Sequence, residues 1–128
     1  MKLLLDTHAV LWWFNGNTAL SQPARAAIAD GDAEVFVSAV SAMEITTKHR
    51  LGKLPEAEGL VFRLEAMMAD QGFAPLDIKF AHGLLAGRLN LSHKDPFDRL
   101  LIAQSLIERI PLVSNEPIFD QAGVSRIW

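Results

Sequence analysis

Short apolar segments separated by longer amphipathic ones predict strands that alternate with helices along this chain. Residues 2–5 and 34–37 are the clearest strands. The first is almost entirely apolar, as is typical of a parallel strand covered on both faces, and the second is rich in β-branched and aromatic residues. Shorter strands are expected at 73–76, 110–114 and 124–128.

Between these strands, apolar residues recur at the spacing of amphipathic helices. Two helix starts are marked by a capping residue with a proline in the first turn, Ser21 with Pro23 and Asp95 with Pro96. Helices are expected at 7–14, from 21 to the turn at 30–32, at 41–51, 56–71 and 78–88, and from 95 onward. This order of elements predicts a parallel α/β sandwich.

Length and composition indicate one globular domain spanning residues 1–128, with a real core. Half of the residues are hydrophobic, which argues against disorder, and no apolar run approaches the roughly 20 residues of a membrane-spanning helix. The apolar stretch before Asp6 is too short for a secretion signal. The absence of cysteine excludes disulfides and thiolate metal sites, and it is consistent with a reducing cytosol.

The net charge of −3 argues against a general nucleic-acid coat protein. It leaves open an enzyme that holds nucleic-acid phosphates through metal ions and a local basic rim. The composition therefore disfavours a nucleic-acid coat protein but does not exclude a nucleic-acid enzyme.

Acidic residues recur where predicted strands end or predicted helices begin. In an open parallel sheet these positions gather at the edge formed by the carboxyl ends of the strands. Carboxylates brought together without a cation repel one another and take up protons, so such a cluster predicts a divalent metal site. Ligands that are all oxygen favour Mg²⁺ or Mn²⁺ over zinc. The candidate residues are Asp6, Glu44, Asp95, Asp98 and Glu116.

Each of these acids, taken alone, also has a purely structural interpretation. Asp6 and Asp95 suit the N-cap of the helix that follows each of them, and Asp98 places negative charge near a helix N-terminus. Glu44 completes a capping-box pattern with the serine three residues before it, and Glu116 is an ordinary loop acid. The metal-site hypothesis therefore depends on the acids occurring together.

The segments around these acids resemble the PIN-domain ribonucleases, specifically the VapC-type toxins of bacterial toxin–antitoxin pairs. The matching segments are LLLDTHAVLWW at 3–13, SAVSAMEI at 38–45, HKDPFDRLLIAQS at 93–105, LVSNEPIF at 112–119 and the closing VSRIW at 124–128. The resemblance covers essentially the whole chain. It implies a three-layer α/β/α sandwich with a short, mostly parallel central sheet.

The resemblance also implies catalytic and metal-binding roles for Asp6, Glu44 and Asp98. Asp95 is an extra acid of the DPFDR segment, expected more often as a helix cap or a support for the ligands than as a ligand itself. The family's last motif carries an aspartate where this chain has Glu116, which is one methylene longer. Both direct ligation by Glu116 and contact through a water molecule therefore stay open.

The implied function is that of an Mg²⁺-dependent endoribonuclease, with Mn²⁺ as a possible substitute, which hydrolyses RNA phosphodiester bonds. Its implied partners are an RNA substrate, a cognate antitoxin protein and a second copy of the chain in a homodimer, in the cytoplasm and not at a membrane. The alternative is a catalytically weakened PIN-fold binding module that acts through its protein partner, which the substitution at Glu116 favours. An aspartyl phosphatase is disfavoured because His8 stands where that class needs a second aspartate.

Basic and aromatic residues near the acids either contact RNA or have an ordinary structural role. An acidic pocket needs a basic rim to hold RNA, although a solvated helix face is the more common role of such residues. Arg99 is also placed to pair with a neighbouring acid, and His8 and His93 lie beside proposed acids. The adjacent Trp12 and Trp13 cannot share one helix face, and packing is expected of them rather than base stacking. The basic candidates are Lys48, Arg50, Lys53, Lys94 and Arg99.

Overall fold

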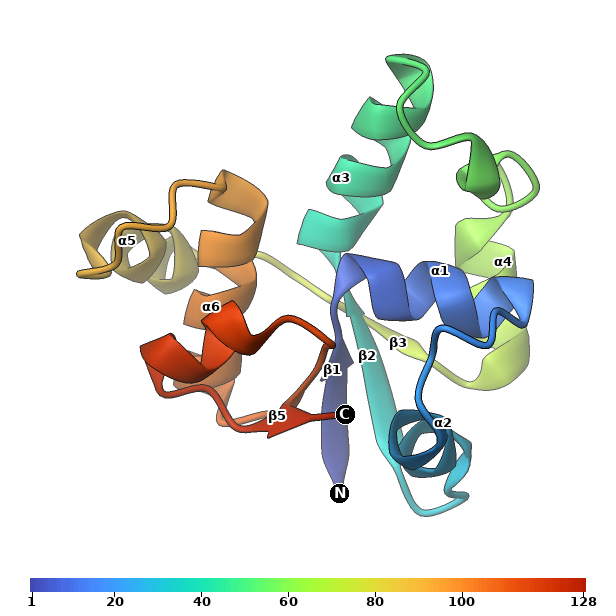
Figure 1. Cartoon of the computed structure of the whole chain (residues 1–128), viewed down its shortest axis with the longest axis horizontal. Helices are drawn as coiled ribbons and strands as arrows, with labels where there is room; N and C mark the ends of the chain where they lie inside the picture. Colours follow the sequence, from blue (N-terminus) through green and yellow to red (C-terminus); the bar gives the residue numbers. More distant parts are fainter.

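A computed structural model describes residues 1–128 as a parallel sheet with helices on both faces (Figure 1). The strands are β1 (Lys2–Leu5), β2 (Glu34–Ser38), β3 (Ala74–Leu76), β4 (Leu112–Val113) and β5 (Arg126–Ile127). The helices are α1 (Thr7–Asn15), α2 (Gln22–Ala29), α3 (Ala39–Arg50), α4 (Leu64–Gln71), α5 (Phe80–Arg88) and α6 (Pro96–Glu108). Two short 3₁₀ helices, η1 (Pro55–Ala57) and η2 (Pro117–Ala122), complete the fold.

The sheet has five strands in the order β3-β2-β1-β4-β5, and every neighbouring pair is parallel. The first strand of the sequence therefore lies at the centre, where Leu5 is in register with Val37 of β2 and Val113 of β4. The carboxyl ends of these three strands consequently meet at one edge. The predicted sandwich is confirmed, and its sheet is wholly rather than mostly parallel.

Two hydrophobic cores, one on each face of the sheet, hold the layers together. Leu3 and Leu5 point into the core that contains apolar residues of α1, α2 and α4. Leu4 and Leu112 point into the other core, which contains apolar residues of α6 and η2. In Figure 1 these two groups of helices lie on opposite sides of the strands. Residues 3–5 are fully buried, which explains why β1 is apolar at consecutive positions.

Several element boundaries differ from the prediction. The helix expected at 41–51 begins two residues earlier, because Ser38 ends β2 and caps α3 by accepting a hydrogen bond from the Val40 amide at 2.9 Å. Ser41 is therefore inside the helix and fully buried, and the expected capping box between Ser41 and Glu44 does not form.

The long helix expected at 56–71 is also wrong. The structure has η1 and a series of turns before α4 begins at Leu64. Gly59 lies within this segment and lowers its helix propensity, while Ala57 and Leu60 are buried in the core. Burial of these apolar anchors therefore outweighs the helical spacing of the sequence.

The remaining boundaries shift by small amounts. The strands expected at 110–114 and 124–128 are reduced to two residues each, and α5 begins at Phe80 rather than at residue 78. The predicted caps Ser21 and Asp95 are confirmed, since each side chain accepts hydrogen bonds from the first turn of its helix. No helix combines the length and the apolar character needed to cross a membrane.

Candidate active site

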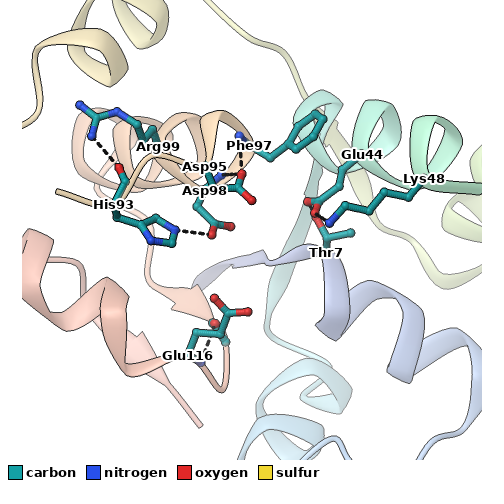
Figure 2. A network of polar contacts seen from close by, with 10 residues as sticks. Thr7, Glu44, Lys48, His93, Asp95, Phe97, Asp98, Arg99 and Glu116 are labelled. Carbon is teal, nitrogen blue, oxygen red and sulfur yellow. Dashed lines mark hydrogen bonds and ion pairs between the residues drawn. The ribbon is translucent and has the colours of Figure 1, made fainter. Parts of the chain in front are cut away.

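All five acids predicted from the sequence line one small cavity, of about 70 Å³, at the carboxyl edge of the sheet. They reach it from the end of β1, from α3, from the start of α6 and from the loop after β4. Figure 2 shows the side chains of Glu44, Asp98 and Glu116 facing this common space. The lining residues are Asp6, Thr7, His8, Glu44, Lys48, Asp95, Asp98 and Glu116.

Asp6 occupies the junction of β1 and α1 and is only 4% exposed. Its Oδ1 accepts a hydrogen bond from the Ala9 amide at 2.8 Å, so the structural role as an N-cap is confirmed. Burial raises the pKa of Asp6 to about 6, against the opposing effect of hydrogen bonds from Ser114 and Ala9, and the charge of Glu116 raises it further. The residue caps a helix and also contributes an acid to the cavity.

Glu44 lies inside α3 rather than at its start, and it is 5% exposed. Thr7 donates a hydrogen bond to Glu44 Oε1 at 2.6 Å, and Lys48 Nζ donates one to Oε2 at 2.5 Å. The Thr7 hydroxyl also lies 3.1 Å from that of Ser41, which joins α1 to α3. The pairing with Lys48 was missed in the sequence, although the i, i+4 spacing of glutamate and lysine is its recognisable signal.

Asp98 faces the cavity from the first turn of α6. His93 Nε2 lies 2.7 Å from Asp98 Oδ2, so this histidine contacts a candidate acid directly, whereas a packed or exposed histidine is the more common case (Figure 2). Burial raises the pKa of Asp98 to about 6 against the opposing hydrogen bond of His93, and the charges of Asp95, Glu116 and Glu44 raise it further. The acids are therefore close enough to disfavour ionisation of one another.

Asp95 and Glu116 have distinct local roles. Asp95 Oδ1 accepts hydrogen bonds from the amides of Phe97 and Asp98 at 2.8 and 3.1 Å, so it caps α6 as expected. Glu116 follows β4, and its backbone amide donates a hydrogen bond to the buried Ser114 hydroxyl at 3.0 Å. This bond closes a turn that fixes the direction of the loop. The half-buried Glu116 side chain lies across the cavity from Asp98 (Figure 2).

Arg99 does not pair with an acid and does not line the cavity. Its guanidinium donates to the carbonyl oxygens of Ala86, Leu89, Leu91 and His93 at 2.6–3.2 Å. These carbonyls belong to the end of α5 and to the connection between α5 and α6. Arg99 therefore holds the segment that carries His93, and the expectation of an acid partner for this arginine is wrong.

The other basic and aromatic candidates lie away from the acids. Arg50, Lys53 and Lys94 are exposed and do not line the cavity. The rings of Trp12 and Trp13 are half-buried, the first 5.8 Å from Trp128 and the second 6.0 Å from Phe73, so packing is confirmed for both. His49 pairs with Glu58 and His82 with Glu108, outside the cavity. Of the five basic candidates, Lys48 alone reaches the acids.

The donor set suits a hard divalent cation because it consists of carboxylate oxygens around one small cavity. Two of the acids have raised pKa values, and a bound cation would remove the repulsion that contributes to them. As the side chains stand, no three His, Asp or Glu residues come close enough together to hold a metal ion. Glu44 Oε2 accepts a hydrogen bond from Lys48 and Asp98 Oδ2 lies beside His93, so each of these oxygens already has a partner that a cation would meet.

Comparison with known proteins identifies the family. The chain matches the PIN domain over residues 3–124. Its fold is similar to that of a chain in the crystal structure of VapBC2 from Rickettsia felis bound to a DNA fragment from their promoter, with a TM-score of 0.72 and 15% identity over 98% of this chain and 97% of that one. It is also similar to a chain of a toxin–antitoxin complex from Klebsiella pneumoniae, with a TM-score of 0.60 and 16% identity over 89% and 86%. No curated protein sequence matches the chain. The chain belongs to the PIN domain family.

Proposed function

We propose that this protein is a metal-dependent endoribonuclease that hydrolyses RNA phosphodiester bonds and serves as the toxin of a toxin–antitoxin pair. The observation that carries the proposal is the convergence of acids from four separate elements on one cavity of a PIN domain. Capping alone does not account for it, because Glu44 caps no helix and is nonetheless buried beside the cavity.

The proposed roles follow from the contacts of each acid. Asp6 and Asp98 would hold Mg²⁺ or Mn²⁺, and Glu44 would complete the site or orient its ligands. When bound, the ion neutralises the acids, attracts a phosphate and lowers the pKa of a bound water. The protein supplies the positioning: Asp6 is fixed by the α1 amide, Asp98 by His93, and Glu44 by Thr7.

Asp95 and Glu116 complete the proposed site in supporting positions. Asp95 holds the first turn of α6 through two amides, which sets the position of Asp98. Glu116 faces Asp98 from the β4 loop. It would reach the ion directly or through water. Its longer side chain extends from a turn fixed by Ser114, so a water-bridged contact suits it.

The proposal also covers the protein's partners and its location in the cell. Similarity of fold to chains of VapBC2 and of a toxin–antitoxin complex supports a cognate antitoxin. A homodimer in the cytoplasm is proposed with it.

Cleavage of purified RNA tests the proposal. The wild-type protein is expected to cut RNA with Mg²⁺ or Mn²⁺ and to stop when a chelator is added. Asp6→Asn and Asp98→Asn are expected to abolish cleavage, whereas Asp120→Asn, a change at an exposed ion pair outside the cavity, retains it. Absence of ion-dependent cleavage by folded wild-type protein would refute the enzyme assignment and favour the binding module.

Expression in cells tests the toxin role separately. Production of the chain alone is expected to arrest growth, and co-production of a cognate antitoxin to restore it. Asp98→Asn should remove the arrest because it removes cleavage. Arrest that persists with this variant would show that toxicity does not depend on the cavity.

A further inference from the structure

Lys48 places an ammonium group inside the acidic cavity. It lies one turn after Glu44 on α3, and its Nζ donates a hydrogen bond to Glu44 Oε2 (Figure 2). The Lys48 side chain is 37% exposed, whereas that of Glu44 is 7% exposed. Apart from Thr7 and His8, every other residue that lines the cavity is an acid. Lys48 is therefore the one lysine or arginine within the cluster.

The surrounding charges favour this position of the ammonium. The hydrogen bond to Glu44 raises the pKa of Lys48 against the opposing effect of burial, and the charges of Glu44, Asp95 and Asp98 raise it further. The interaction thus extends beyond the i, i+4 partner to acids of α6. A glutamate–lysine pair on an open helix surface would lack these additional acids.

The two hydrogen bonds to Glu44 differ in how readily they break. Thr7 is buried at the junction of β1 and α1, and its short side chain fixes the hydroxyl beside Oε1. Lys48 holds Oε2 from a long, flexible stem that reaches solvent. An incoming cation can therefore take Oε2 by displacing Lys48 while Thr7 keeps its hydrogen bond.

We propose that Lys48 is an exchange cation: its ammonium and a divalent ion compete for Glu44 Oε2, and the displaced ammonium then binds a phosphate of the RNA. This inference rests on the proposed function, because it takes the cavity as the metal site. It assigns the released lysine to the substrate because the other basic candidates lie outside the cavity or, like Arg99, are bound to backbone carbonyls.

Mn²⁺ binding without RNA tests the competition. Lys48→Met keeps an unbranched side chain, one atom shorter, and removes its charge. It is expected to bind Mn²⁺ about tenfold more tightly, as the loss of one competing charge-assisted hydrogen bond implies. Lys48→Arg, which retains a charge, is expected to stay near the wild-type affinity. Lys79→Met is the matched control, because Lys79 pairs with Glu108 outside the cavity. Unchanged or weaker Mn²⁺ binding by Lys48→Met would overturn the inference.

A double-mutant cycle separates direct exchange from a general effect of charge. If Lys48 competes for Glu44 itself, the gain produced by Lys48→Met disappears in a Glu44→Gln background. A gain of the same size in both backgrounds would refute direct exchange. Circular dichroism checks folding, and Lys48→Gln replaces Lys48→Met if the latter does not fold.

RNA cleavage at saturating Mn²⁺ tests the second half of the inference. Lys48→Met is expected to raise KM by about tenfold, the loss of one charge-assisted phosphate contact, with a smaller change in kcat. An unchanged KM would refute the phosphate contact. If wild-type protein neither binds Mn²⁺ nor cuts RNA, the proposed function itself fails. If wild type does both and Lys48→Met behaves like wild type, the role of Lys48 alone fails.

Discussion

Asp98→Asn replaces a charged carboxylate among other acids with a neutral amide of nearly the same shape. The Asp98 side chain is 18% exposed, and burial together with neighbouring acids raises its pKa from 3.8 to about 6. Its ionised form is therefore disfavoured in the folded protein. The amide oxygen of asparagine can still accept a hydrogen bond from His93. We expect the variant to be more stable than wild type at neutral pH when divalent ions are removed.

The magnitude follows from the pKa difference between the folded and unfolded chain. A pKa raised from 3.8 to about 6 corresponds to about 3 kcal/mol. Between these pH values the folded state binds more protons than the unfolded state, so stability falls as the pH rises. The destabilisation is complete above about pH 6 and absent below about pH 4. Asp98→Asn should thus gain up to about 3 kcal/mol at neutral pH and almost nothing near pH 4.

Urea denaturation in the presence of a chelator measures this difference at both pH values. Asp120→Asn is the control with the opposite sign, because its hydrogen bond to Arg126 lowers the pKa of Asp120. That variant should lose stability at neutral pH. Added Mn²⁺ should narrow the gap between wild type and Asp98→Asn, since the ion binds wild type more tightly. A variant less stable than wild type at neutral pH, or a gain that is equal at both pH values, would refute the reasoning.

Three further substitutions test the fold around the cavity by chemical denaturation. Ser38→Ala should lower the free energy of unfolding by about 2–4 kcal/mol, because it removes the cap of α3 and also the hydroxyl that donates to the buried Gln104 Oε1 at 2.6 Å; an unchanged stability would contradict the assigned helix start. Arg99→Met should lower the free energy of unfolding by about 2–4 kcal/mol, because four carbonyl oxygens lose a charged donor. It should also speed amide hydrogen exchange in residues 89–95, and unchanged exchange there would contradict the role assigned to Arg99. Phe119→Ala should cost about 3–5 kcal/mol because the ring is fully buried, and a loss below 1 kcal/mol would show that the core closes around the gap.

The position of the acids was predictable because local patterns and parallel topology act together. Asp6 follows an apolar strand and Asp95 precedes a proline, so both were placed correctly at the start of a helix. A parallel sheet then brings the ends of β1, β2 and β4 to one edge. The position of these acids at one edge does not establish which of them bind a metal ion, and their roles as metal ligands stay predictions.

The errors arise where distant parts of the chain decide a local choice. Ser38 and Ser41 both suit a helix cap, and tertiary contacts accompany the use of Ser38: Ser41 packs beside Thr7, while Ser38 also donates to Gln104 of α6. The partners of Arg99 are backbone carbonyls whose direction depends on the path of the connection between α5 and α6. The segment before α4 follows the burial of Leu60 rather than its helical spacing. None of these choices is encoded by residue type at a fixed spacing.

The central position of β1 has a consequence for folding. Its pairing with β4 joins Leu5 to Val113, so nearly the whole chain must be looped before the two strands meet. A partly folded molecule that lacks this pairing leaves the loop after β4, which carries Glu116, detached from the strand that ends at Asp6. We therefore expect cleavage activity to emerge only together with global folding, and a protease cut between these strands to leave no active fragment.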